Sequence, residues 1–150
     1  MKLNKLLTII TASFLIFTNH SNAHVNIDFI EADKYRVECD GQSKVFNDIT
    51  KLLNEINNFI GHHFTINSIT LDREHINTIV LRNINVINNQ CILVLRGNNN
   101  FKPNILFDNG GNILAFHDIR HRNIGRLTFT NVIFPNFIIV HMGIIIAQDL

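Results

Sequence analysis

The sequence has few cysteines and little excess charge, and each shortage argues against a class of protein. Its two cysteines, Cys39 and Cys91, have no companions at the short spacings of a four-ligand zinc site. Lys and Arg together number 13 against 12 Asp and Glu, whereas nucleic-acid-binding proteins normally carry a strong basic excess. We therefore expect no nucleic-acid partner, no metal and no other cofactor.

The N-terminal apolar run is also too short for a membrane-spanning helix, which needs roughly 20 apolar residues. This run, residues 6–17, follows Lys2 and Lys5 and precedes Ser21-Asn22-Ala23, which offers small residues three and one before a cut. That order is typical of a cleavable signal peptide over residues 1–23. We expect a mature chain that begins at His24, has no transmembrane span and is secreted, periplasmic or on the cell surface.

Cleavage leaves residues 24–150, a length that suits a single domain. The loss of Lys2 and Lys5 leaves 11 basic against 12 acidic side chains, so the mature chain is nearly neutral. An exported chain meets an oxidising compartment, where Cys39 and Cys91 could form a disulfide. The alternative is two separately buried thiols.

The first part of this domain, residues 24–61, is predicted to be a hairpin followed by one helix. Two stretches alternate apolar and polar residues around a turn at Glu31-Ala32-Asp33. The apolar spacing then becomes helical up to Ile60, with Asn47 as N-cap and Gly61 at the C-terminal end. The alternating apolar positions are Val25, Ile27 and Phe29, then Tyr35, Val37 and Cys39.

From Phe64 onward, short apolar runs end in similar three-residue strings. These are Leu81-Arg82-Asn83, Phe107-Asp108-Asn109 and Phe129-Thr130-Asn131, at intervals of 26 and 22 residues. Repeats of this length built from short strands are typical of stacked coils. Asn tolerates the left-handed conformation at tight corners, so we expect Asn83, Asn109 and Asn131 to be structural corner residues.

The strings LTFTN, LRNINV and ILFDNGG resemble those of right-handed parallel β-helix proteins, the pectin-lyase-like enzymes and the surface-adhesin repeats, over about residues 64–134. The resemblance implies a mainly β protein: a short parallel β-helix over residues 64–150, either complete or truncated, with the early helix capping its end. The alternative fold is an antiparallel β-sandwich with one helix.

The resemblance does not extend to catalytic residues. The Asn-Thr-Asp, Asp-Asp, His-Gly and Arg-x-Lys strings of the family's hydrolases are all missing. A fold without its site does not carry the activity. We therefore expect a secreted or surface-exposed, non-catalytic module that binds carbohydrate or a host surface. The alternative is a carbohydrate-active enzyme of polyuronate lyase or hydrolase type, or a truncated remnant of one.

One segment concentrates positive charge and is the candidate binding site. It contains Arg120, His121, Arg122 and Arg126, whose guanidinium groups could hold acidic polysaccharide or a lipid headgroup. The alternative interpretation is a solvated turn.

Overall fold

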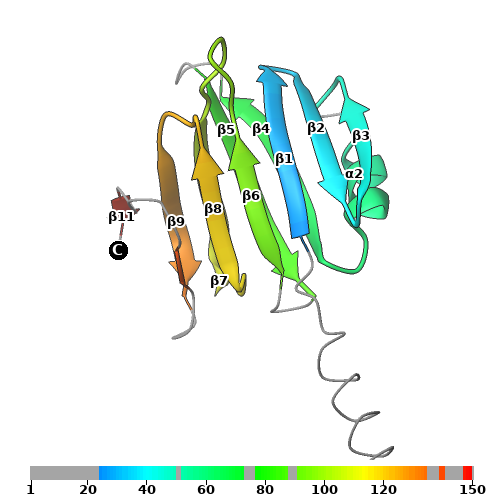
Figure 1. Cartoon of the computed structure of the whole chain (residues 1–150). Coiled ribbons are helices and arrows are strands. Elements are labelled where there is room, and N and C mark those ends of the chain that lie inside the picture. The colour runs from blue at the N-terminus through cyan, green and yellow to red at the C-terminus, as the bar shows by residue number, and fades with distance from the viewer. Residues whose placement is uncertain are drawn as a thin grey trace, which may run out of the picture.

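In the computed structural model of the chain, two β-sheets lie face to face (Figure 1). Their buried apolar side chains form the core. The structure describes residues 24–49, 52–72, 77–87, 91–134, 139–140 and 147–149. The predicted signal peptide, residues 1–23, lies outside the described residues. No helix within the described ranges is long and apolar enough to cross a membrane.

The first sheet, sheet A, has six described strands in the order β10, β8, β6, β1, β2, β3. Strands β1, β2 and β3 pair antiparallel, whereas β6 runs parallel to β1, and β8 and β10 continue in parallel beyond it. The bounds are β1 His24–Glu31, β2 Lys34–Cys39, β3 Gln42–Phe46, β6 Ile92–Arg96, β8 Asp118–Arg122 and β10 Ile139–Val140.

The second sheet, sheet B, has five described strands in the order β11, β9, β7, β5, β4. The β4–β5 pair is antiparallel, and β5, β7, β9 and β11 are parallel neighbours. After β5 the chain therefore alternates between the sheets. The bounds are β4 Phe64–Asp72, β5 Thr78–Val86, β7 Asn104–Ile113, β9 Leu127–Ile133 and β11 Ala147–Asp149.

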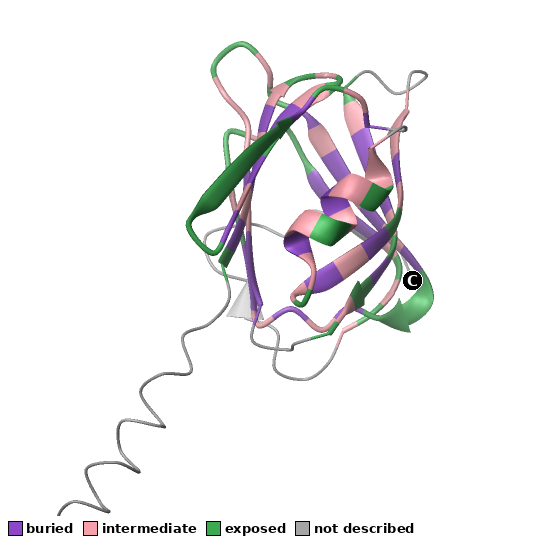
Figure 2. Ribbon diagram, turned by 90° about the vertical axis from the view of Figure 1, so that its right-hand side faces the viewer, coloured by how far each residue is buried: buried purple, intermediate pink, exposed green. Residues whose placement is uncertain are grey.

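Helix α2 (Leu53–Ile60) lies between the two sheets beside β4, with its apolar side turned inward (Figure 2). Ile56 and Ile60 are buried there. The Asn57 side chain fixes the helix to β4, because its Nδ2 donates to the Ile66 carbonyl and its Oδ1 accepts from the Ile66 N–H, both at 2.9 Å. The helix thus covers an edge strand that would otherwise expose unpaired backbone groups.

The predicted parallel β-helix over residues 64–150 is wrong, and the pectin-lyase-like resemblance fails with it. Strands β4 and β5 are antiparallel, with Leu71 opposite Ile79. Only residues 73–77 join them, and parallel pairing of consecutive strands needs a crossover of about a dozen residues or more. The sheets are mixed and do not close into a solenoid.

The alternative prediction, a mainly β sandwich with one helix, fits better. The structure has two sheets and one described helix, but its strands are not all antiparallel. The repeated strings that suggested coils do lie side by side, because Leu81 pairs with Phe107 and Phe107 with Phe129 in parallel register. They align within one sheet of a mixed sandwich.

The early hairpin is confirmed, whereas the helix begins later than predicted. Strands β1 and β2 pair with Val25 opposite Cys39. The sequence predicts Asn47 as the N-cap, but the preceding Phe46 ends β3, where its ring stacks on Tyr35 at 5.6 Å between centroids, and the helix starts only at Leu53. Sheet pairing therefore overrides the local helical period. The helix ends at Gly61 (φ 45°), as predicted.

The core between the sheets is continuous and rich in Phe. Phe116, in the connection from β7 to β8, is fully buried. Its ring packs edge-on against Phe64 at 5.5 Å and against Phe107 at 6.4 Å, so it touches two strands of sheet B. Another part of the core, lined by Ile27, Tyr35 and neighbouring apolar side chains, leaves a void of only about 10 Å³. That void holds no more than one water molecule, which leaves no room for a ligand.

Replacing Phe116 with Ala should therefore destabilise the protein by about 3–5 kcal/mol. The substitution removes buried contacts and leaves a cavity that the neighbouring side chains can fill only in part. Ile113→Ala is the matched control, since Ile113 is 57% exposed at the end of β7, and it should change stability by less than about 0.5 kcal/mol. Urea unfolding followed by circular dichroism measures both. Equal losses for the two variants would contradict this description of the core.

Candidate ligand-binding groove

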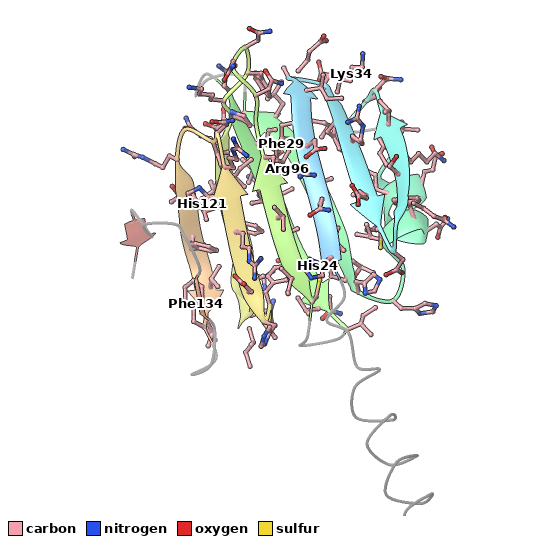
Figure 3. The ribbon with its side chains drawn as sticks, in the orientation of Figure 1. His24, Phe29, Lys34, Arg96, His121 and Phe134 are labelled. Atoms are coloured by element: carbon pink, nitrogen blue, oxygen red, sulfur yellow. The ribbon has the colours of Figure 1, made fainter. Side chains whose placement is uncertain are left out.

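Strand β1 contributes polar side chains to the outer face of sheet A because its residues alternate strictly. Val25, Ile27 and Phe29 point into the core, each at most 5% exposed. Successive side chains of a strand point to opposite faces, so Asn26 and Asp28 lie on the outer face. Figure 3 shows this face toward the viewer, with Arg96 on β6 beside β1.

Two arginines from different parts of the chain converge on the Asp28 carboxylate. The Nε of Arg96 donates to Asp28 Oδ1 at 2.6 Å. On the other side of β1, Arg36 Nη1 lies 3.9 Å from Oδ2. Register explains the convergence, because Asp28 is paired with Arg36 across the β1–β2 ladder and with Arg96 across the β1–β6 ladder. Both arginine side chains remain partly exposed, at 49% for Arg36 and 39% for Arg96.

A tight loop after β6 closes one end of this face. The Asn98 side chain donates to the carbonyls of Phe29 and Ile30 at 3.1 and 3.0 Å, so it ties the loop to the end of β1. Gly97 donates to the Arg122 carbonyl at 2.9 Å. A Cβ on Gly97 would stand 2.0 Å from the Asn123 carbonyl oxygen, so only glycine fits there.

Together these elements form an open groove of about 750 Å³. Its volume falls within the roughly 300–1,000 Å³ typical of ligand sites. It crosses from β3 over β2 and β1 to the end of β6, and its lining mixes basic, acidic and neutral polar groups. The lining residues are Asp28, Phe29, Ile30, Arg36, Glu38, Ser43, Arg96, Gly97 and Asn98.

Positive charge continues beyond the groove on β8. Arg122 pairs with Arg96 in the parallel register, so two outward arginines stand on neighbouring strands. Arg122 forms no ion pair with any residue in the described ranges. Arg120, also outward, differs because its Nε donates to the nearly buried carboxylate of Asp118 at 2.8 Å. Of these two arginines, Arg122 is therefore the one without an ion-pair partner among the described residues, and it lies next to the groove.

The structure divides the basic segment that the sequence analysis singled out. Arg120 and Arg122 belong to the outer face of sheet A. His121 pairs with the buried Leu95, and burial lowers the pKa of its imidazole, so it is neutral near pH 7. Arg126 lines a separate hollow of about 340 Å³ over β5, β7 and β9 of sheet B. The connection from β8 to β9 crosses between the sheets, which separates Arg126 from the other two arginines.

The predicted Asn corners differ from one another. Asn83 (φ 50°) and Asn131 (φ 51°) adopt the left-handed conformation. Asn109 does not; it is buried and its Nδ2 donates to the Asn112 and Ile113 carbonyls at 3.2 Å, while Gly110 takes the positive φ beside it. The Asn131 side chain reaches Asp108 Oδ1 at 3.4 Å. All three residues lie within strands of sheet B, in β5, β7 and β9, and do not line the groove.

The two cysteines are free, so the predicted disulfide is not present. Cys39 ends β2 and Cys91 immediately precedes β6, with β1 between those strands. Burial, together with the charge of the neighbouring Asp40 and a hydrogen bond to it, raises the pKa of Cys39 to about 11. Burial raises the pKa of Cys91 to about 12, with smaller contributions from Cys39 and Asp40.

A second group of polar side chains lies at the end of the sandwich where β2 turns into β3. Cys39 Sγ, an Asp40 carboxylate oxygen and a His63 ring nitrogen all lie within 4.8 Å of one another. Asp40 and Gly41 form the turn, both with positive φ (52° and 75°). His63 follows helix α2, and its Nε2 lies 3.0 Å from Asp40 Oδ2. These are side chains that could hold a metal ion.

Sequence reasoning missed the arginines of the groove as well as this second group. Asp40-Gly41 was a readable signal, since Asp-Gly between alternating residues marks a two-residue hairpin turn. Arg36 and Arg96 gave no such signal, because they lie 60 positions apart and meet only through pairing on both sides of β1.

Comparisons of the chain with family models, with curated proteins and with solved structures found no match. The groove and the second group are therefore interpreted from their chemistry alone.

In the folded, metal-free protein both thiols should react slowly with a thiol reagent at pH 7. Their raised pKa values leave almost no thiolate, which is the reactive form, and both side chains are buried. In denaturant without reductant, two thiols per chain should react at once. Absorbance titration measures both states, and the absence of reactive thiols in denaturant would show that a disulfide had formed.

Proposed function

We propose that the protein is an exported, non-catalytic binding module that holds acidic carbohydrate in the groove on the outer face of sheet A. Export is inferred from the predicted signal peptide at residues 1–23. The ligand class is inferred from the groove itself, because its partly exposed arginines lie on the outer face of sheet A, away from the core.

The observation that supports this proposal most directly is that Arg36 and Arg96 both contact the Asp28 carboxylate. A guanidinium group binds carboxylates through several N–H donors and with defined geometry. Each arginine offers five such donors, and Asp28 engages only some of them. Both side chains line the groove, so their remaining donors are available there to bind the carboxylate of a uronate sugar.

The other lining groups suit the hydroxyls of a sugar. Ser43 and Glu38 stand opposite each other across the β2–β3 ladder and line the same groove. A hydroxyl group both donates and accepts, and a carboxylate accepts only, so this pair can bind sugar hydroxyls. Asn98 is already engaged through both ends of its amide, so we assign it to shaping the groove.

The shape favours a polymer over an enclosed small molecule. The groove is open along the sheet and leads toward Arg122, which extends the positive surface onto β8. An extended acidic chain can therefore place one carboxylate at Arg96 and another at Arg122. Such a contact between exposed charges weakens as salt screens it.

Isothermal titration with oligogalacturonate at low salt tests the proposal, with variants Arg96→Ala and Arg96→Lys. Charged hydrogen bonds contribute about 1.5–3 kcal/mol, so Arg96→Ala should weaken binding by about tenfold or more. Arg96→Lys keeps the charge but loses the planar fork, so its affinity should lie between those of the other two proteins. Since the Arg96–Asp28 pair is partly exposed, stability should change by less than about 1 kcal/mol.

Arg126→Ala is the matched control, because it removes the same charge from sheet B. It should bind as tightly as the unmodified chain. The proposal fails if the unmodified protein does not bind, or if Arg126→Ala weakens binding as much as Arg96→Ala. Shortening of the polymer, or new unsaturated ends, during the titration would overturn the non-catalytic part and identify the enzyme alternative.

The exported form should begin at His24. Expression of the full chain in a host with a general secretory pathway, followed by N-terminal sequencing of the protein outside the cytoplasm, tests this. Small residues at positions 21 and 23 direct the cut after Ala23, so Ala23→Lys should leave the longer form in the cells. An exported protein that still begins at Met1 would contradict the prediction.

A further inference from the structure

We propose that Cys39, Asp40 and His63 form a binding site for a divalent transition-metal ion of the zinc class. The site is separate from the groove, and the inference does not depend on carbohydrate binding. It rests on three ligand types gathered from two distant segments of the chain.

The three side chains are brought together by the hairpin turn and by the exit from the helix. Cys39 is the last residue of β2, and its side chain points inward with 4% exposure. Asp40 follows in the two-residue turn, at the mouth of the site. His63 comes from the segment between α2 and β4, and its carbonyl accepts from the Ile87 N–H at 3.1 Å. That bond fixes the His63 backbone to the start of the loop after β5.

The ligand atoms are close to the spacing that zinc requires. Bond lengths of about 2.0–2.3 Å in a tetrahedral site place neighbouring ligand atoms about 3.5 Å apart. Asp40 Oδ2 and His63 Nε2 are already 3.0 Å apart, and all three ligand atoms lie within 4.8 Å. The Asp40 side chain is 69% exposed, so its carboxylate can rotate toward a bound ion without moving the core.

The chemistry of the set selects a borderline metal. Thiolate and imidazole favour zinc and its neighbours, whereas magnesium and calcium require oxygen ligands almost exclusively. Three protein ligands leave a fourth position for water or for an external ligand. On binding, the Cys39 thiol gives its proton to solvent and its sulfur forms the bond to the ion.

The electrostatic setting also favours a cation. In the metal-free chain, burial, and after it the charge and hydrogen bond of Asp40, raise the pKa of Cys39 and keep the thiol protonated. The same negative charge attracts a divalent ion at this position. A bound ion would offset the repulsion between the Asp40 carboxylate and the Cys39 thiolate, so both groups could be negatively charged and bind the ion together.

Reduced, metal-free protein titrated with Co²⁺ and then with Zn²⁺ tests the proposal. We expect one ion per chain, thiolate-to-cobalt absorption, and loss of that absorption when Zn²⁺ displaces Co²⁺. Asp40→Asn and His63→Gln should each weaken Zn²⁺ binding by about tenfold or more, which corresponds to about 1.4 kcal/mol or more. Asn tolerates the left-handed turn conformation, so Asp40→Asn should keep its fold.

Two matched controls separate the site from general surface binding. Asp33→Asn alters an exposed acid in the other hairpin turn of sheet A, and His62→Gln alters the exposed histidine beside His63. Both should bind Zn²⁺ like the unmodified chain. The proposal is overturned if these controls lose as much affinity as Asp40→Asn and His63→Gln, or if no cobalt–thiolate absorption appears.

Cys91 provides a further discrimination, because its thiol lies in the electrostatic field of Cys39 and Asp40. Cys91→Ala should retain the ion, since the three assigned ligands remain. If Cys91→Ala abolished binding while Asp40→Asn and His63→Gln had no effect, the ion would be held by the two thiols and the assigned ligand set would be wrong.

Discussion

Strand β1 is hydrogen-bonded on both of its edges, and the rest of the structure depends on this double pairing. On one edge it runs antiparallel to β2, the next strand in the sequence. On the other edge it runs parallel to β6, which begins only at Ile92. It therefore joins an early meander to a later region where the chain alternates between two sheets. Its inward Val25, Ile27 and Phe29 anchor the shared core, so a one-residue slip would move these side chains to solvent.

Both proposed sites depend on how β1 pairs with its neighbouring strands. The groove exists because the outward Asp28 lies in register with an arginine on either side. The candidate metal site exists because the β1–β2 register places Cys39 and the turn after it at one end of the sandwich, where His63 leaves the helix. The apolar face provides stability, while the polar face and the strand ends remain available for chemistry. The two sites lie on different parts of sheet A and can be tested separately.

The sequence predicted the local elements better than their assembly. Alternation between Val25 and Phe29 identified the first hairpin, and Gly61 correctly marked the end of the helix, because these signals act over a few residues. The β-helix prediction failed because the repeated Asn-containing strings indicate which strands are neighbours. They do not indicate whether each neighbouring pair is parallel or antiparallel. The short connection between β4 and β5 was the available signal of an antiparallel pair. For the site, Arg122 was identified in advance, but Arg36 and Arg96 become recognisable only after long-range pairing is known.

We propose that acidic carbohydrate binds on the outer face of sheet A, in the groove lined by Arg36 and Arg96. Backbone amide shifts of isotope-labelled protein, followed by NMR during titration with oligogalacturonate, test it most directly. We expect the largest shift changes at residues 28–30, 36–38 and 96–98, with smaller changes near Arg122. Changes centred on Arg126 and the strands of sheet B, or no changes at all, would contradict it.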